Sequence, residues 1–202
     1  MNTGRISVLE SLKQIDRFFQ GQDAVHKTLR RTANRLEGSR IPYAVIGGMA
    51  VNLHGYRHTT GDVDILLTSD GLEAFRNCFV PEDYEADARR MRRFLDRRTA
   101  TPVDVALKGS FAGPDKVRGL SYPDPCSVRV RIDDLWVADL TALIQIKLAI
   151  GRYCDLGDVA GLIRSNRLDA TLAERLHPWL RREYVNCLAE NGREDEYEAR
   201  QG

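Results

Sequence analysis

The 202-residue sequence contains few cysteines, and none of them form a closely spaced pair. Zinc ribbons, redox couples and small disulfide frameworks depend on such pairs, so the spacing excludes these classes. The sequence therefore predicts reduced thiols in a cytoplasmic protein. The four cysteines are Cys78, Cys126, Cys154 and Cys187.

Long apolar runs and an excess of charge of either sign are also missing. No window is long and apolar enough for a membrane span, and the first residues lack the apolar core of a signal peptide, so no membrane partner is expected. Thirty Lys and Arg residues face 29 Asp and Glu residues. This balance excludes a general attraction to nucleic acid, so any such binding has to be local.

Hydrophobic residues make up 43% of the chain, which is enough for a core, and their spacing divides the chain into regions. Apolar residues at intervals of three and four predict two helices within residues 1–38. Short apolar runs then predict a core of strands and helices over 39–138, including a hairpin of 92–96 with 103–107. Residues 139–190 are expected to be helical, and the charged segment 191–202 to be a flexible tail.

Two glycines and two aspartates stand in one short stretch. Gly47 and Gly48 end an apolar run, and after thirteen intervening residues Asp62 and Asp64 flank Val63. Glycines allow backbone N–H groups to approach a phosphate, and alternate residues of a strand share one face. Two carboxylates that meet on one face repel each other unless they share a cation, and Mg²⁺ prefers such oxygen ligands. Alone, each pair is typical of a turn or a solvated strand end, but their combination favours a nucleotide site.

A third carboxylate lies on a later apolar run. Asp104 stands between Val103 and Val105, where it completes a carboxylate triad or else faces solvent from an edge strand. The sequence predicts that Asp62, Asp64 and Asp104 surround one cleft beside the two glycines.

In these residues the sequence resembles the polymerase-beta-like nucleotidyltransferase superfamily, whose signature is an apolar residue, two small residues, a spacer and an Asp-x-Asp strand. More narrowly, it resembles the AbiEii and MenT branch of bacterial toxin-type nucleotidyltransferases. The stretches that carry this narrower resemblance are 43–67 with Arg57 and Thr60, 103–107, and 143–163 with Lys147, Arg152, Asp155 and Asp158.

The resemblance implies an α+β nucleotidyltransferase fold with a mixed β-sheet flanked by helices. It implies transfer of a nucleoside monophosphate, or a few nucleotides, from a nucleoside triphosphate to an acceptor such as tRNA or a protein. The resemblance also implies a cognate antitoxin and two Mg²⁺ ions, with Mn²⁺ as an alternative. The implied roles are metal binding and catalysis for Asp62, Asp64 and Asp104, and phosphate binding for Gly47, Gly48, Arg57, Lys147 and Arg152.

The sequence also departs from the family pattern. Cys154 stands where the family has a lysine, which removes one cation from the implied site. Lys147 is equally well explained as a solvated helix residue.

Two other groups invite a functional interpretation. His54 and His58 have the spacing of a helical metal pair, but Gly55 lies between them and no acidic third ligand follows, so no zinc site is expected. A basic cluster either steers RNA or solvates a hairpin, and the lack of interleaved aromatic residues favours solvation. Its members are Arg89, Arg90, Arg92, Arg93, Arg97 and Arg98.

Three hypotheses therefore remain open: an active nucleotidyltransferase, a nucleotide-binding module without turnover, and an RNA-binding protein with structural carboxylates. Retention of all three aspartates favours the first hypothesis, because a binding module does not need all of them.

Overall fold

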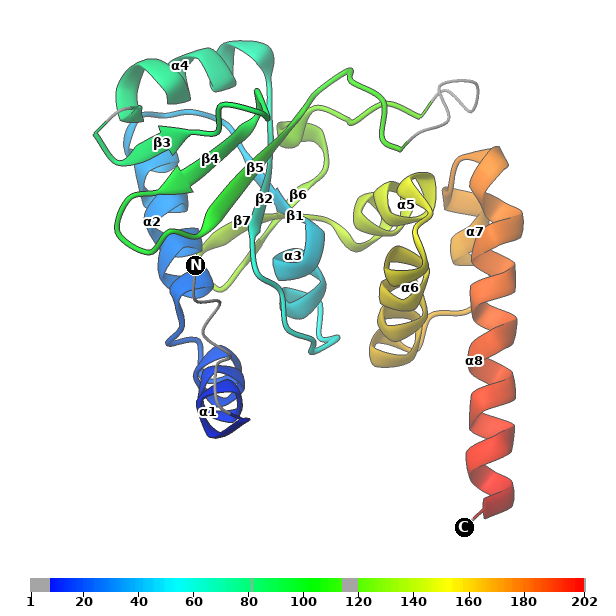
Figure 1. Ribbon diagram of the computed structural model, residues 1–202. Coiled ribbons are helices and arrows are strands. Elements are labelled where there is room, and N and C mark those ends of the chain that lie inside the picture. The colour runs from blue at the N-terminus through cyan, green and yellow to red at the C-terminus, as the bar shows by residue number, and fades with distance from the viewer. Residues whose placement is uncertain (1–7, 81, 114–119, 202) are drawn as a thin grey trace.

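A computed structural model describes residues 8–80, 82–113 and 120–201 (Figure 1). Its centre is a seven-stranded mixed sheet in the order β3-β4-β5-β2-β1-β7-β6. The strands are β1 (Ala44–Ile46), β2 (Val63–Leu67), β3 (Tyr84–Ala86), β4 (Arg93–Asp96), β5 (Pro102–Leu107), β6 (Arg129–Ile132) and β7 (Leu135–Ala138). The sheet and its flanking helices confirm the predicted α+β class with a mixed sheet.

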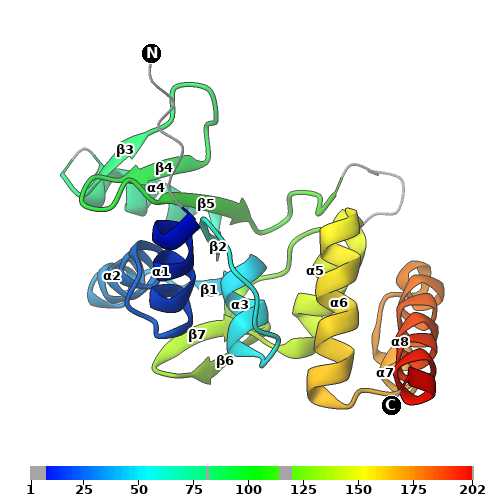
Figure 2. The ribbon, with the colours of Figure 1, turned by 60° about the horizontal axis from the view of Figure 1, so that its bottom comes forward.

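Eight α-helices accompany the sheet in the described part of the chain. They are α1 (Val8–Phe19), α2 (Ala24–Gly38), α3 (Gly47–Leu53), α4 (Ser69–Phe79), α5 (Leu140–Ile150), α6 (Tyr153–Asn166), α7 (Leu172–Arg175) and α8 (Arg181–Gln201). Helices α5 to α8 lie beside the sheet rather than across it, with α6 between α5 and α8 (Figure 2). None of the described helices is long and apolar enough to cross a membrane.

The central strands alternate between two environments. Val63, Ile65 and Leu67 of β2 are buried in the main hydrophobic core, which α2, α3 and α4 also enter. Leu66, between them, belongs to a smaller cluster that includes Ile46 of β1 and Ile146 of α5. Because side chains alternate along a strand, Asp64 lies on the same face as Leu66, which is the face of the smaller cluster.

Local residues explain where the helices begin and end. Asp23 accepts hydrogen bonds from the amides of Val25 and His26 and so caps α2. Asp139 caps α5 through the amide of Ala142, and α5 ends at Gly151, whose φ of 68° is in the left-handed region. In the β6–β7 hairpin, Asp133 and Asp134 have φ values of 45° and 61°, as a tight hairpin turn requires.

Strand β3 pairs with β4 and was not expected from the sequence. Helix α8 runs through Gln201, so it includes most of the segment 191–202 for which a flexible tail is predicted, and residue 202 lies outside the described residues. Asn191 at the start of this segment is buried and donates to the carbonyl of Ala160 at 2.8 Å, whereas Arg193 forms an exposed ion pair with Glu190 of the same helix. Flexibility of the segment stays a prediction.

An aromatic cluster packs α4 against β3 and β4. The Phe75 ring centroid lies 5.4 Å from that of Phe79, 5.0 Å from Tyr84 and 5.1 Å from Phe94. Phe75 is almost fully buried.

We predict that Phe75→Ala lowers the free energy of unfolding by about 3–5 kcal/mol, since it removes a buried ring and leaves a cavity. Phe111, whose exposed fraction is 47%, provides the matched control, and Phe111→Ala should change stability much less. Urea denaturation of both variants measures the difference. Equal losses would contradict the packing described for α4.

Candidate active site

The sheet brings Asp64 and Asp104 side by side. Strands β2 and β5 pair in parallel with Asp64 opposite Asp104, so both carboxylates project from one face. Asp62 lies just before β2, and its Oδ2 is 3.7 Å from the Nη2 of Arg93, which also bonds Asp104. The structure therefore gathers the three predicted aspartates at one place, as their spacing suggested.

The two glycines are required by their neighbours. Gly47 has a φ of 63°, and a Cβ on it would lie 1.9 Å from Oδ2 of Asp64. A Cβ on Gly48 would lie 2.8 Å from Cβ and Oγ1 of Thr60. A larger residue at either position would push against the side chain of Asp64 or Thr60, so the glycines allow the start of α3 to lie directly against Asp64.

The surroundings of Asp64 disfavour its charge. Among the described residues, none donates a hydrogen bond to its carboxylate. Protein atoms surround the half-buried group, and this desolvation, followed by the charges of Asp62 and Asp104, raises its pKa from 3.8 to about 7; Lys147 and Arg152 oppose the rise. A cation placed among these carboxylates would relieve the repulsion.

Asp104 already has a cationic partner. The Nε of Arg93 donates to Oδ1 of Asp104 at 2.7 Å and its Nη2 donates to Oδ2 at 2.5 Å. The hydrogen bond and charge of Asp104 raise the pKa of Arg93 above its usual value. The sequence placed Arg93 in a general basic cluster and missed this contact. The predicted hairpin places Arg93 and Asp104 on neighbouring strands, but it does not give the register that sets them opposite each other.

The donor chemistry suits Mg²⁺, because three carboxylates converge beside glycine amides and one of them lacks a partner. As the side chains lie, no three Asp, Glu, His or Cys groups of the described residues enclose a metal position. Asp104 meets Arg93 instead. The predicted metal site thus has its ligands in one place without the closed arrangement of a bound ion.

Lys147 is buried on α5 and bonds two aspartates of α6. Its Nζ donates to Oδ1 of Asp155 at 3.0 Å and to Oδ2 of Asp158 at 2.6 Å. Burial disfavours its charge, but the bonds to Asp158 and Asp155 prevail and raise its pKa. These two bonds explain the position of Lys147 better than the alternative of a solvated helix residue.

Asp155 connects Lys147 to Arg152. Its Oδ2 accepts from Nε of Arg152 at 2.7 Å, and its Oδ1 accepts from Nη2 at 3.2 Å. Burial works against the charge of Asp155, but Arg152 and Lys147 together lower its pKa. The Arg152 side chain keeps an exposed fraction of 66%, so it is the accessible cation of this network, and Cys154 beside it is exposed.

Arg57 and His54 lie apart from this network, whereas His58 lies at its edge. Arg57 packs over the Phe19 ring, 4.8 Å from its centroid, and donates to the Phe19 carbonyl at 3.1 Å, so it ties α1 to the loop before β2. A ring nitrogen of His54 bonds the carbonyl of Ala138, whereas His58 lies 3.5 Å from Asp158. The two histidines thus contact different residues.

A cleft of about 720 Å³ opens beside the aspartates. Its lining includes Asp64, Asp104, Arg90, Arg92 and Arg93, together with the aromatic residues Phe111 and Tyr122. Burial, with the charges of Asp64 and Asp155, raises the pKa of Tyr122, which was not predicted as a site residue. The cleft divides the basic cluster, because Arg97 faces Glu85 and Arg98 lines a different cavity.

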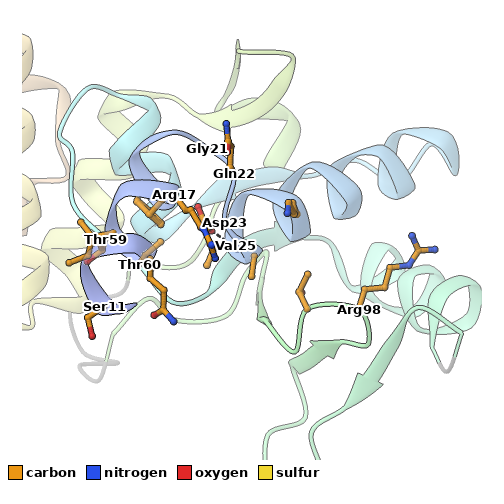
Figure 3. A pocket seen from close by; sticks show the side chains of 15 residues that line it. Ser11, Arg17, Gly21, Gln22, Asp23, Val25, Thr59, Thr60 and Arg98 are labelled. Atoms are coloured by element: carbon orange, nitrogen blue, oxygen red, sulfur yellow. Dashed lines mark hydrogen bonds between the residues drawn. The ribbon is translucent and has the colours of Figure 1, made fainter. Parts of the chain in front are cut away.

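That other cavity, of about 1150 Å³, lies beside α1 and is lined by Arg17, Asp23, Thr59, Thr60 and Arg98 among others (Figure 3). It contains none of the predicted catalytic aspartates. Thr60 connects the two regions, since its hydroxyl donates to Oδ1 of Asp62 at 3.0 Å. We therefore assign the chemistry to the smaller cleft, which Asp64 and Asp104 line, whereas Asp62, Gly47 and Gly48 are not part of its lining.

Comparisons with known proteins give the following. No protein-family model and no curated protein sequence matches the chain. Among solved structures, the chain is similar to JHP933 from Helicobacter pylori, with 13% identity, 88% of this chain and 97% of that one covered, and a TM-score of 0.45. It is also similar to an antigenic nucleotidyltransferase-like protein from Paracoccidioides brasiliensis, with 17% identity, 81% and 85% covered, and a TM-score of 0.47. Because these sequence identities and TM-scores are low, the function is judged from the site itself.

We predict that Asp64 contributes stability to the metal-free protein at low pH and that this contribution is lost as pH rises from about 4 to 7. In this range the folded protein retains the Asp64 proton that the unfolded chain has lost, so each pH unit favours unfolding by at most about 1.4 kcal/mol. Asp64→Asn should lack this contribution and be more stable than the parent above pH 7. Urea denaturation at several pH values in chelator measures it, and identical pH profiles for parent and variant would contradict it.

We also predict that Lys147→Met lowers the free energy of unfolding by about 3–5 kcal/mol, because it leaves Asp155 and Asp158 buried near each other without their shared cation. Adding Asp158→Asn to this variant should restore part of the loss. Denaturation of the single and double variants measures the coupling. An additive loss in the double variant would show that Lys147 and Asp158 do not depend on each other.

Proposed function

We propose that the protein is a metal-dependent nucleotidyltransferase that moves a nucleoside monophosphate, or a few nucleotides, from a nucleoside triphosphate to an acceptor. The observation that carries this proposal is the in-register pair of Asp64 and Asp104 with Asp64 against Gly47. This arrangement holds like charges close together although they repel each other. A function that requires a bound cation at these carboxylates would explain the arrangement.

Asp62, Asp64 and Asp104 are the residues that would hold Mg²⁺, or Mn²⁺, in one or two positions. When bound, the metal would neutralise the triphosphate and lower the pKa of the acceptor hydroxyl. Gly47 and Gly48 would direct backbone N–H groups at the phosphates, at the start of a helix that no side chain caps. The nucleophile belongs to the acceptor, so the chain need not supply one.

Arg152 is the cation that we assign to the leaving pyrophosphate. Its guanidinium is exposed, Asp155 holds it in place, and it is near enough to Asp64 to affect that residue's pKa. Lys147 would support Arg152 indirectly, because the Lys147 ammonium pairs with Asp155 and Asp158. A direct contact between Lys147 and a phosphate would require it to break one of these ion pairs. A fixed positive charge at this position stabilises the charge that develops on the departing group.

The acceptor that the cleft suits best is RNA, with tRNA as an example. Arg90 and Arg92 line the cleft beside the aspartates and can bind backbone phosphates, while Phe111 is 47% exposed and can stack on a base. A protein acceptor would have less use for this combination. A toxin role and a cognate antitoxin follow only from the sequence resemblance.

One observation favours a second function, a nucleotide-binding module without turnover. Arg93 bonds both carboxylate oxygens of Asp104, so Asp104 already has a cationic partner in a protein that does not bind metal. Binding of the nucleoside triphosphate without divalent cation would support this alternative.

We predict that Asp62→Asn or Asp64→Asn lowers the transfer rate by at least about 10²-fold and leaves the fold intact, because Asn keeps the size and loses the charge. The assay incubates each variant with labelled nucleoside triphosphates, Mg²⁺ and total RNA and identifies the labelled product. Asp134→Asn is the matched control, since Asp134 is exposed in a hairpin turn whose positive φ Asn tolerates. Transfer at the parent's rate by the Asp62 or Asp64 variant would refute the proposed metal site.

A further inference from the structure

We propose that Arg93 is an internal competitor for the metal: its guanidinium holds Asp104 when no cation is bound, and it must release Asp104 before the aspartates can close around a divalent ion. This inference rests on the proposed function, because it assumes that the cation binds at Asp62, Asp64 and Asp104. It assigns to Arg93 a regulatory and positioning role in metal loading.

The geometry shows why the two cations compete. The guanidinium forms two parallel hydrogen bonds, at 2.7 and 2.5 Å, with the two oxygens of Asp104. The Nη2 atom also lies 3.7 Å from Oδ2 of Asp62, so Arg93 stands between two of the three carboxylates. Each Asp104 oxygen keeps a further lone pair, but a metal ion that used it would share the carboxylate with a guanidinium of like charge, so the two cations compete for Asp104.

The pair is built into the sheet. Arg93 and Asp104 lie directly opposite each other on the antiparallel strands β4 and β5. Their side chains are 22% and 29% exposed, so water screens this pair less than it screens a surface ion pair. Arg93 offsets one negative charge of the aspartate group, which stabilises the metal-free protein and weakens its attraction for a cation.

After it releases Asp104, the Arg93 guanidinium can bind phosphate oxygens in the cleft. Arg93 lines the same cleft as Arg90 and Arg92, and Arg92 there bonds the hydroxyl of Ser110 at 3.3 Å. A nucleoside triphosphate in this cleft would offer phosphate oxygens to replace Asp104 as the partner of Arg93. Metal and nucleotide would therefore bind cooperatively, since each compensates for one half of the broken ion pair.

The test measures the affinity of the full chain for Mn²⁺, without nucleotide, by water-proton relaxation. We expect Arg93→Gln to bind Mn²⁺ at least about 10-fold more tightly than the parent, because it frees Asp104. Arg92→Gln is the matched control, since it removes the same charge from the same cleft without touching Asp104, and it should change the affinity much less. Adding a non-hydrolysable nucleotide analogue should tighten Mn²⁺ binding more in the parent than in Arg93→Gln.

The outcomes separate the inference from the function on which it rests. If Arg93→Gln bound Mn²⁺ no more tightly than Arg92→Gln, the competition would be refuted while the metal site stood. If parent and variants alike failed to bind Mn²⁺, with and without the analogue, the metal site and the competition would both be refuted. If Arg93→Gln did not fold, Arg93→Lys would decide, because lysine keeps the charge but loses the bidentate contact, and it should still bind more tightly than the parent.

Discussion

The parallel pairing of β2 with β5 is the constraint on which the rest of the site depends. It sets Asp64 beside Asp104 on one face, while Val63 and Val103 on the other face are fully buried in the main core. Because the side-chain period of a strand is two, a slip by one residue would bury the carboxylates and expose the valines. The hydrophobic core therefore holds like charges together that would otherwise separate, and Gly47 and Arg93 adapt to that imposed arrangement.

Much of this arrangement could be predicted from the sequence, because the signals are local. Alternation along an extended chain predicted a shared face for Asp62 and Asp64, although β2 begins only at Val63 and Asp62 lies just before it. Two glycines at the end of an apolar run already indicate a close backbone approach, although the neighbours that require them are Asp64 and Thr60. The hairpin of β4 and β5 and the helical region after Asp139 were recognisable from hydrophobic spacing in the same way, and both are present in the structure.

Contacts that depend on register or on helix packing could not be predicted from one sequence. The pairing of Arg93 with Asp104 follows from the turn between β4 and β5, where Ala100 has a φ of 55° and no glycine marks the turn type. Lys147 meets Asp155 and Asp158 only because α5 and α6 pack against each other after Gly151. The family resemblance implies phosphate binding for Arg57, yet its side chain contacts Phe19, which is 38 residues away in the chain.

The buried ammonium of Lys147 also limits how this sequence can change over time. Two carboxylates lie within 3.0 Å of it, and these in turn contact Arg152 and His58. Replacing one member leaves an unbalanced charge where water has little access, so single replacements cost more than coordinated ones. In descendants of this sequence, positions 147, 155 and 158 should accordingly keep or lose their charges as a set, whereas a neighbour such as the exposed Cys154 is free to vary alone.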